Sequence, residues 1–397
     1  MNTRGTKAEL DSTKLSNLAR LYKLIDESDL DAIVATSLEN VAYTSGFYNA
    51  GLRQEPNRLH IAIWPKGGQP VFVVPQYNLD LDSFIQDRRG YDRYLRKDLI
   101  KDQRGRSEQL SSPIPVLAEV LREKGLSDGR IGLEKMHFPA LRYEELKESM
   151  PSAKFVACES LFNEARMIKT PAEIQHLQQA SITTLKAIQA GFLLAKPGDT
   201  PRRVANQIGG ALDVRGADSR FFLELDGMAD GKRFDFLGEP IQLKQGDIIR
   251  VDAGGVFAGY LSDVARMAVV EKISPEYQST YQRLILVQKK LIEQIIKPGL
   301  TGSELFRQTE QAFQNVGLKV PWGMIVHGIG MDIHERPWIR EMETYTFEPN
   351  MTLMVEVYNH GPGGKIQIQI EDLVLVTEKG AKVLSTFGST EQPFIIE

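Results

Sequence analysis

The sequence predicts two domains, a small α/β domain followed by a larger mixed α/β domain with antiparallel hairpins. A chain of 397 residues, 42% of them hydrophobic, is too long for one ordinary core. Short apolar runs alternate with helical patterns until about residue 160. Beyond that point long helical patterns are followed by strands joined through short turns. We therefore place the two domains at residues 14–160 and 161–397.

The first domain is expected to begin with one amphipathic helix. From Lys14 to Ser28 apolar residues recur at helical spacing. Three short apolar runs bounded by turn formers then predict strands, with Lys66-Gly67-Gly68 as the hairpin turn between the second and the third. The strands are DAIVAT, RLHIAIWP and QPVFVVP, and the helices that follow are PVLAEVLREKG and FPALRYEELKESM.

The second domain opens with a helix that has a clear start signal. Thr170 is the expected N-cap, Pro171 the first helical residue and Glu173 the capping-box residue. We expect this helix to run to about Leu194. The next predicted elements are the helix TPRRVANQIGGALDVRG, the strands SRFFLEL, DIIRVDAG and YLSDVARMAVV, the helices PEYQSTYQRLILVQKKLIEQII and GSELFRQTEQAFQNVG, and the strands MTLMVEVYN and KIQIQIEDLVLVTEKG.

The composition excludes several classes of protein. A formal net charge of −4, with both signs interspersed, argues against a nucleic-acid binder and against a polybasic membrane anchor. No segment is long and apolar enough to span a bilayer, and residues 1–13, which are polar and predicted to be disordered, contain no signal-peptide core. The single cysteine, Cys158, rules out an intrachain disulfide. We expect a cytoplasmic protein that binds neither nucleic acid nor membranes.

Asp252 and Asp263 flank a predicted hairpin. With the turn around Val256 to Gly259, they fall nearly opposite each other on neighbouring strands, where Cβ atoms lie roughly 4.5–5.5 Å apart. Two like charges at that distance destabilise a sheet unless a cation lies between them. For this pair alone, an exposed hairpin with two solvated aspartates is an equally simple interpretation.

Two glutamates lie on predicted strands. Glu356 lies inside the apolar run MTLMVEVY, where a carboxylate is costly unless it is protonated, bound to a metal or paired with a buried arginine. Glu371 shares one face of an alternating strand with Gln367 and Gln369, while isoleucines occupy the other face. A polar face of this kind lines either a site or a solvent surface.

His327 and His334 lie in the glycine-rich segment VHGIGMDIHERP. Its glycines allow close backbone approach and sharp turns, so both imidazoles can reach one cleft. A single histidine is more often a structural residue than a ligand, so the whole set decides the interpretation. Four carboxylates and one imidazole suit two divalent cations that share bridging oxygens, and the residues are Asp252, Asp263, His327, Glu356 and Glu371.

These segments resemble the pita-bread metallopeptidases (family M24), the group of methionine aminopeptidase, Xaa-Pro aminopeptidase, prolidase and the creatinase-like amidinohydrolases. The matching segments are MIKTPAEIQHLQQAS, VDAG…GYLSDVAR, VHGIGMDIHERP, VEVYN and QIEDLVLVTEKG, and LDAIVATSLENVAYTSGF resembles the creatinase-type N-terminal domain. The resemblance covers nearly the whole chain. It implies an α/β creatinase-type domain, a pita-bread α+β catalytic domain and a homodimer, with Tyr48 or Arg53 as candidates to enter the partner's cleft.

The resemblance implies a ligand for each metal position. Asp252 would hold one of two divalent ions, Asp263 and Glu371 would bridge both, and His327 with Glu356 would complete the second. Mn²⁺ is the expected ion, and Zn²⁺, Co²⁺ and Fe²⁺ suit the same oxygen-rich set.

The resemblance also implies an activity. The expected reaction is hydrolysis of a C–N bond by an Xaa-Pro dipeptidase or aminopeptidase. His334 would hydrogen-bond the substrate carbonyl or the tetrahedral intermediate, and Glu356 would transfer the proton. Basic and aromatic residues that suit a short peptide or a small carboxylated substrate are Arg233, Phe234, Tyr260, Arg336 and Trp338, although surface charge and core packing would explain the same residues.

Two departures from the family pattern leave the substrate open. The family peptidases usually carry a further histidine upstream of the first aspartate, but FFLELDGMADGKRFDFLGEP has Arg233 or Phe234 near that place, and Val357 replaces the usual proline. Members that work without metal lack the five ligands, all of which this chain keeps. The alternatives are therefore a non-peptidase enzyme on the same scaffold, such as an ectoine-hydrolase-like enzyme or a dimethylsulfoniopropionate lyase, and, less favoured, a non-catalytic binding protein.

Overall fold

The computed structural model describes residues 15–49, 51–52, 58–91, 112–321, 325–361 and 367–397. It forms two compact units, Met1–Arg166 and Met167–Glu397. The boundary predicted between residues 160 and 161 lies inside helix α5 (Glu159–Met167), so the structure divides the chain at the end of that helix. The predicted disordered tail and Arg53 lie outside the described residues.

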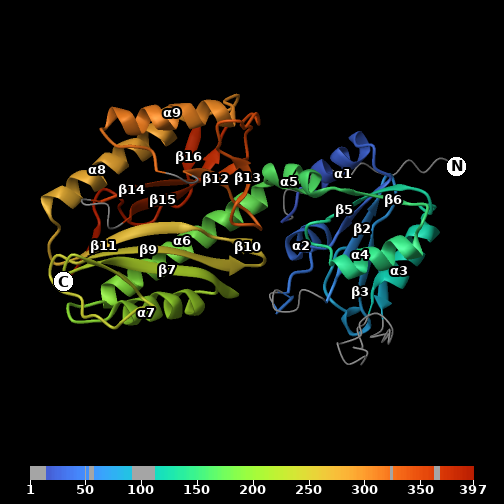
Figure 1. The fold of residues 1–397 in the computed structure, drawn as a ribbon, viewed down its shortest axis with the longest axis horizontal. Helices are drawn as coiled ribbons and strands as arrows, with labels where there is room; N and C mark the ends of the chain where they lie inside the picture. The colour runs from blue at the N-terminus through green and yellow to red at the C-terminus, as the bar shows by residue number, and fades with distance from the viewer. Residues whose placement is uncertain (1–14, 50, 53–57, 92–111, 322–324, 362–366) are drawn as a thin grey trace. The chain divides into compact units, whose positions relative to one another are not determined.

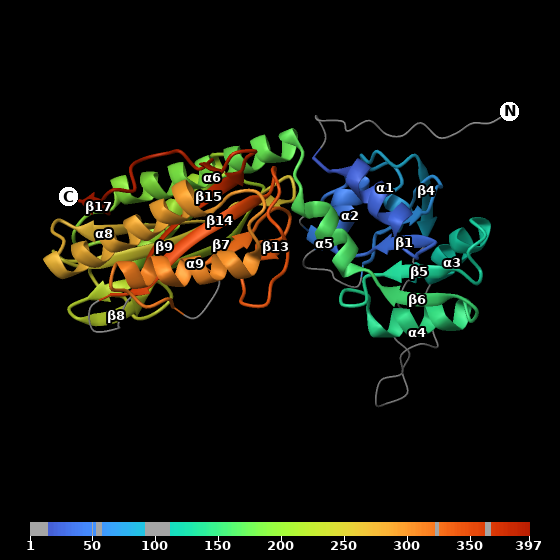
Figure 2. The same cartoon turned by 90° about the horizontal axis from the view of Figure 1, so that it is seen from above.

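The first unit is built around one mixed sheet. In the described residues this sheet has six strands in the order β4-β3-β2-β1-β5-β6, and β1, β5 and β6 run parallel to one another. Figure 2 shows these three strands in that order, with α4 beyond β6. The elements are α1 (Leu18–Glu27), β1 (Ala32–Ala35), α2 (Leu38–Ser45), β2 (Ile61–Pro65), β3 (Val71–Pro75), the 3₁₀ helix η2 (Gln76–Asn78), β4 (Asp87–Tyr91), α3 (Ile114–Glu123), β5 (Arg130–Leu133), α4 (Ala140–Ser149) and β6 (Lys154–Ala157), followed by α5.

The apolar runs of the first unit form its core, as predicted. Strands β1, β2 and β3 are buried along their whole length, because each is a short run of apolar residues that includes β-branched side chains. The segment Lys66-Gly67-Gly68 connects β2 to β3, and Gly67 has φ +66, a conformation that glycine adopts without strain. The sequence interpretation did not identify β4, whose residues DRRGY carry three charges and no apolar alternation.

The second unit contains two sheets. In the described residues the first has the order β17-β11-β9-β7-β8, with β10 paired to β9, and the second has the order β13-β12-β14-β15-β16. The helices are α6 (Pro171–Leu194), α7 (Pro201–Val214), α8 (Pro275–Lys290), the π-helix η3 (Leu291–Ile295) and α9 (Gly302–Asn315). The strands are β7 (Ser219–Ala229), β8 (Lys232–Asp235), β9 (Ile248–Phe257), β10 (Tyr260–Leu261), β11 (Val264–Val270), β12 (Val326–Gly328), β13 (Glu335–Trp338), β14 (Thr352–His360), β15 (Gln367–Val376), β16 (Ala381–Val383) and β17 (Phe394–Ile396).

Helices cover both sides of the strands in the second unit. Figure 1 shows α6 and α7 on one side, where they contact β9 and β7, and α8 on the other side, where it contacts β14 and β15. The main apolar core lies between α8, α9 and the second sheet and includes Leu284, Phe313 and Val355. The two sheets therefore face each other between helix layers, and polar side chains on their facing surfaces are removed from solvent.

The predicted start of α6 is confirmed in detail. The hydroxyl of Thr170 accepts the backbone N–H of Glu173 (3.1 Å), and the Glu173 carboxylate accepts the backbone N–H of Thr170 (2.7 Å). These two bonds satisfy donors that a helix N-terminus otherwise leaves unpaired. Neither α6 nor any other helix in the described part of the chain has the length and apolar character needed to cross a bilayer.

Candidate metal centre

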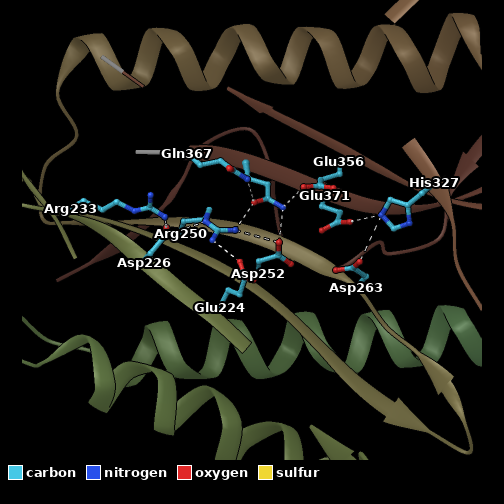
Figure 3. Close-up of polar contacts among 11 residues, drawn as sticks. Glu224, Asp226, Arg233, Arg250, Asp252, Asp263, His327, Glu356, Gln367 and Glu371 are labelled. Carbon is cyan, nitrogen blue, oxygen red and sulfur yellow. Dashed lines mark hydrogen bonds and ion pairs between the residues drawn. The ribbon is translucent and has the colours of Figure 1, made fainter. Parts of the chain in front are cut away.

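Five buried or partly buried polar side chains meet between the two sheets of the second unit. Asp252 comes from β9 and Asp263 from the short link between β10 and β11, while His327, Glu356 and Glu371 come from β12, β14 and β15. Figure 3 shows His327 directed toward Asp263, which comes from the other sheet's segment of chain, and toward Glu371, which lies in the same sheet as His327. The structure thus brings together the whole set that the sequence predicted.

The relation between the two aspartates differs from the prediction. Asp252 pairs with Ala265, not with Asp263, in the β9–β11 ladder. The turn falls at Ala258 and Gly259, both with positive φ, so Asp263 lies two residues from direct opposition and is a diagonal neighbour of Asp252. The two aspartates and Glu371 remain close enough to bind one metal ion together, because one carboxylate oxygen from each lies within 4.8 Å of the other two.

Glu356 and Glu371 are direct cross-strand partners on β14 and β15. Directly paired residues of neighbouring strands share one face, so both carboxylates are directed to the same place. The polar face of β15 lines an interior site rather than solvent, because Gln369 and Glu371 are 0% and 1% exposed. Glu356 accepts a hydrogen bond from the Gln369 amide (2.9 Å), which differs from the predicted alternative of a direct arginine pair.

His327 presents one ring nitrogen to the carboxylates. Its Nδ1 lies 3.1 Å from the carbonyl of Gly328, and because a carbonyl only accepts, Nδ1 carries the proton. This leaves the lone pair on Nε2, which is 3.7 Å from Glu371 Oε1 and 3.9 Å from Asp263 Oδ2. The ring of His334 packs edge-on against that of His327, with centroids 4.7 Å apart.

The unpaired atoms of this centre fit divalent cations. Asp252 Oδ1, His327 Nε2 and both carboxylate oxygens of Glu371 are buried without a hydrogen-bond partner in the described residues. Buried polar atoms that converge in this way are normally satisfied by hydrogen bonds or by a bound ion. The potential ligand atoms form three overlapping groups within 4.8 Å, namely Asp252, Asp263 and Glu371; His327, Glu356 and Glu371; and Asp263, His327 and His334.

Burial and mutual repulsion control the charge of the carboxylates. Burial raises the pKa of Asp252 to about 6 against the opposing effect of Arg250. Burial, and then the charges of neighbouring carboxylates, raise the pKa of Asp263, Glu356 and Glu371 well above the usual range. Four carboxylates in one buried place therefore resist full ionisation unless cations compensate them.

Burial acts on the two histidines in the opposite direction. It lowers the pKa of His327 to about 4, with a further contribution from His334, and it also lowers the pKa of His334. Both rings are therefore neutral near pH 7, and a neutral imidazole is the form that binds a metal ion.

Metal binding should stabilise the protein more at about pH 7.5 than at about pH 5. Carboxylates whose pKa is raised by folding stabilise the metal-free protein below their unfolded pKa, near 4, and this contribution is lost as the pH rises through the folded pKa, about 6 for Asp252. Bound cations would compensate the charges of the ionised carboxylates and so restore the stability that ionisation removes. Melting with Mn²⁺ or EDTA at both pH values should show a Tm increase several degrees larger at the higher pH, since 1 kcal/mol corresponds to roughly 2–4 °C. Equal increases at both pH values would contradict this prediction.

Arg336 and Trp338 lie on β13 directly after His334. The guanidinium of Arg336 stacks over the rings of Trp338 and Tyr345, at 5.3 and 4.6 Å from their centroids, and Arg340 lies 4.5 Å from the Trp338 centroid. The indole Nε1 of Trp338 donates to the carbonyl of His334 (3.1 Å). This group of cations and aromatic rings is therefore fixed next to His334.

The other predicted substrate contacts have different surroundings. Arg233 is largely exposed and pairs with Asp226 (2.8 Å). Phe234 is buried with its ring against Gly227, and Tyr260 is buried and donates its hydroxyl to Glu173 (2.8 Å). The last two side chains are 8% and 1% exposed and are engaged in packing, and their contact with substrate stays a prediction. Tyr48 lies in the first unit.

Arg250 and Gln369 are polar residues of the centre that the sequence interpretation missed as functional candidates. Arg250 is two residues before Asp252 on β9, and Gln369 is two residues before Glu371 on β15, so the period of a strand places each beside a predicted ligand. That periodicity was the signal that could have found both residues.

The fold and this donor set define a metal-dependent hydrolase with a separate N-terminal α/β domain. Profiles of known protein families match each of the two units. The profile of metallopeptidase family M24 matches residues 175–378, and that of the creatinase/prolidase N-terminal domain matches residues 17–168. The chain belongs to metallopeptidase family M24, which confirms the family and the fold class predicted from its motifs.

Individual relatives share only about a quarter of their residues with this chain. An Xaa-Pro dipeptidase of Pyrococcus furiosus is 28% identical over 61% of this chain and 70% of its own length, and an Xaa-Pro dipeptidase of Lactobacillus helveticus is 25% identical over 95% and 97%. Among solved structures, an Xaa-Pro dipeptidase from Bacillus anthracis shares the fold with a TM-score of 0.77 and 23% identity, over 95% of this chain and 98% of that one.

Proposed function

We propose that this protein is an Xaa-Pro dipeptidase or aminopeptidase that hydrolyses a C–N bond with the help of two divalent ions. The observation that carries the proposal is the convergence of unpaired buried atoms from Asp252, His327 and Glu371. The names of the Xaa-Pro dipeptidase relatives support the substrate class.

The five predicted ligands divide naturally between two ions. Asp252 would hold one ion, Asp263 and Glu371 would bridge both, and His327 with Glu356 would complete the second. The overlapping groups of potential ligand atoms support this assignment, because Asp263, His327 and Glu371 each belong to two of them. When bound, such ions supply Lewis acidity, which lowers the pKa of a water molecule and polarises a carbonyl. Mn²⁺ is the proposed ion.

The chain's own residues perform the remaining tasks. Glu356, whose pKa is raised by burial, accepts a proton from the attacking water and passes it to the leaving nitrogen. His334 is exposed and lies beside His327, where it donates a hydrogen bond to the substrate carbonyl and stabilises the negative charge that develops there.

Arg336 is our candidate to bind the carboxylate of a dipeptide. Its guanidinium plane stacks on two aromatic rings and its Nη1 lies 4.0 Å from Glu343 Oε1, so a substrate carboxylate would share the N–H donors at its edge with that glutamate. Through the bond from Trp338 to the carbonyl of His334, this group is fixed relative to the residue that would contact the scissile bond. A small substrate with a free carboxylate fits this arrangement.

One observation favours a second candidate function. The β7–β8 hairpin carries Arg233 and Phe234 where the family's further histidine is expected, and Arg233 pairs with Asp226. A highly charged site without that histidine suits a small zwitterion or cyclic amidine. A non-peptidase enzyme on the same scaffold is therefore the alternative.

A substrate panel separates the two functions. The metal-free protein should be assayed with X-Pro dipeptides, cyclic amidines and zwitterions, side by side, with Mn²⁺, Zn²⁺, Co²⁺ or EDTA. We expect hydrolysis of X-Pro dipeptides with Mn²⁺ and none with EDTA. Turnover of an amidine or zwitterion without hydrolysis of any X-Pro substrate would replace the peptidase by the alternative. Elemental analysis should find about two divalent ions per chain, and no stoichiometric metal would reject the metal mechanism. The homodimer and the cytoplasmic location remain predictions.

A further inference from the structure

Arg250 lies at the centre of a buried polar network beside the metal centre. Its side chain is 7% exposed, and all three guanidinium nitrogens donate hydrogen bonds. Nε donates to Asp226 (2.7 Å), Nη2 to Glu224 (2.9 Å), and Nη1 to Gln369 (2.8 Å), with Asp252 at a longer 3.4 Å. Figure 3 shows this network extending from the metal centre toward Arg233.

The guanidinium fixes the orientation of the Gln369 amide. A guanidinium can only donate, so the oxygen of the amide faces Arg250 and its NH₂ group faces away. A second donor, Gln367 Nε2, also contacts that oxygen (2.9 Å). The NH₂ group then donates to Asp252 Oδ2 (2.8 Å) and to Glu356 Oε1 (2.9 Å), so both of its hydrogens are used on proposed ligands.

The network uses one oxygen of Asp252 and leaves the other available. Oδ2 accepts from Gln369 and from Arg250, while Oδ1 is buried without a hydrogen-bond partner in the described residues. A carboxylate held by one oxygen has a defined direction for the other. The same amide connects Glu356 to Asp252, so the two ligands, one from each sheet, are oriented by one group.

We propose that Arg250 and Gln369 are a positioning pair that orients Asp252 and Glu356 for metal binding. The inference rests on the proposed metal site and extends it to two residues outside the ligand set. Arg250 acts through Gln369 and through Asp252, so its effect is on the geometry and affinity of the centre. The pair also supplies hydrogen bonds and positive charge to carboxylates that would otherwise repel one another before metal binds.

Direct titration of Mn²⁺ into the metal-free full chain tests this pair. Gln369→Leu removes the amide at similar volume, Arg250→Met removes the charge, and Arg250→Lys keeps the charge without the planar fork. We expect Gln369→Leu and Arg250→Met to weaken Mn²⁺ affinity by roughly 10–100-fold, the range measured for residues that orient ligands. Arg250→Lys should fall between Arg250→Met and the parent. At saturating Mn²⁺ much of the hydrolytic activity should return.

Arg142→Met is the matched control. Arg142 is also a buried arginine paired with a carboxylate, Glu145 (3.0 Å), but it lies in the first unit. Its loss should lower Tm while leaving Mn²⁺ affinity within twofold of the parent. If Gln369→Leu and Arg250→Met also stay within twofold, the positioning role is rejected. If the parent itself binds no Mn²⁺, the proposed metal site fails first, so the two failures are distinguishable.

A double-variant cycle tests whether the two residues act as a unit. If Arg250 works through the Gln369 amide, Arg250→Met should cost much less affinity in the Gln369→Leu background than in the parent. Additive losses in the cycle would overturn the paired mechanism. This cycle compares folded proteins, and Arg250→Lys can replace Arg250→Met should the latter fail to fold.

Discussion

Replacing Asp263 with asparagine should abolish both metal binding and hydrolysis. Asp263 is buried, contributes to two of the three groups of potential ligand atoms, and has one oxygen 3.9 Å from His327 Nε2. Asparagine keeps the shape but removes the charge that a bridging ligand supplies. We expect kcat/KM to fall by at least ~10³-fold, as for other groups on which the whole reaction depends. Elemental analysis and X-Pro dipeptide assays measure the two effects separately.

Glu134→Gln is a matched control for that variant. Glu134 is a buried carboxylate of the first unit, where it accepts hydrogen bonds from the backbone of Ser37 and the side chain of Asn40. Its replacement should lower Tm without removing metal. Full metal content and activity in Asp263→Asn would contradict the bridging role of Asp263.

Lys169→Met should destabilise the protein strongly. Lys169 Nζ lies 2.6 Å from Glu335 Oε1, and the two side chains are 1% and 2% exposed. Glu335 also packs closely against Gly330 and directly follows His334. Removing the cation leaves a buried carboxylate without its charge partner, which costs roughly 3–5 kcal/mol. Tm should fall by about 10 °C, as measured by calorimetry.

Two variants test the cause of that loss. In Lys169→Met/Glu335→Leu the remaining charge is also gone, so much of the stability should return, because buried ion pairs are often replaceable by apolar residues. Lys289→Met removes an exposed pair with Glu391 and should leave Tm nearly unchanged. If the double variant is no more stable than Lys169→Met, the unpaired charge of Glu335 is not the cause of the lost stability.

Local patterns in the sequence predicted most of the fold. The helix start at Thr170 and the apolar strands β1 to β3 carry their signals within a few residues, so both were predictable. Strands such as β12 and β17 are three residues long and are defined by their partners in the sheet rather than by their own pattern. Such elements depend on tertiary contacts, which a local pattern does not contain.

The metal centre was predictable as a set of residues but not as a geometry. The five ligands could be assigned because their motifs resemble a known family. The diagonal relation of Asp252 and Asp263, however, depends on where the turn falls. The burial of Phe234 depends on packing against Gly227, which no motif marks. The burial of Tyr260 depends on a hydrogen bond to Glu173, which is distant in sequence. Arg250 was hidden because its partners Asp226, Glu224 and Gln369 come from two other strands, β7 and β15.

The five proposed ligands come from the segments of two different sheets, so metal binding is coupled to folding. Asp252 is carried by β9 and Asp263 by the link between β10 and β11, and the other three are carried by β12, β14 and β15. In an unfolded chain these residues are spread from position 252 to position 371, so the complete set exists only in the native state. A ligand that binds only the native state stabilises it by about 2.7 kcal/mol at a free concentration 100 times its Kd. The divalent ion would thus act as a folding ligand, and the fraction of chains that survive proteolysis in a cell would follow the free metal concentration.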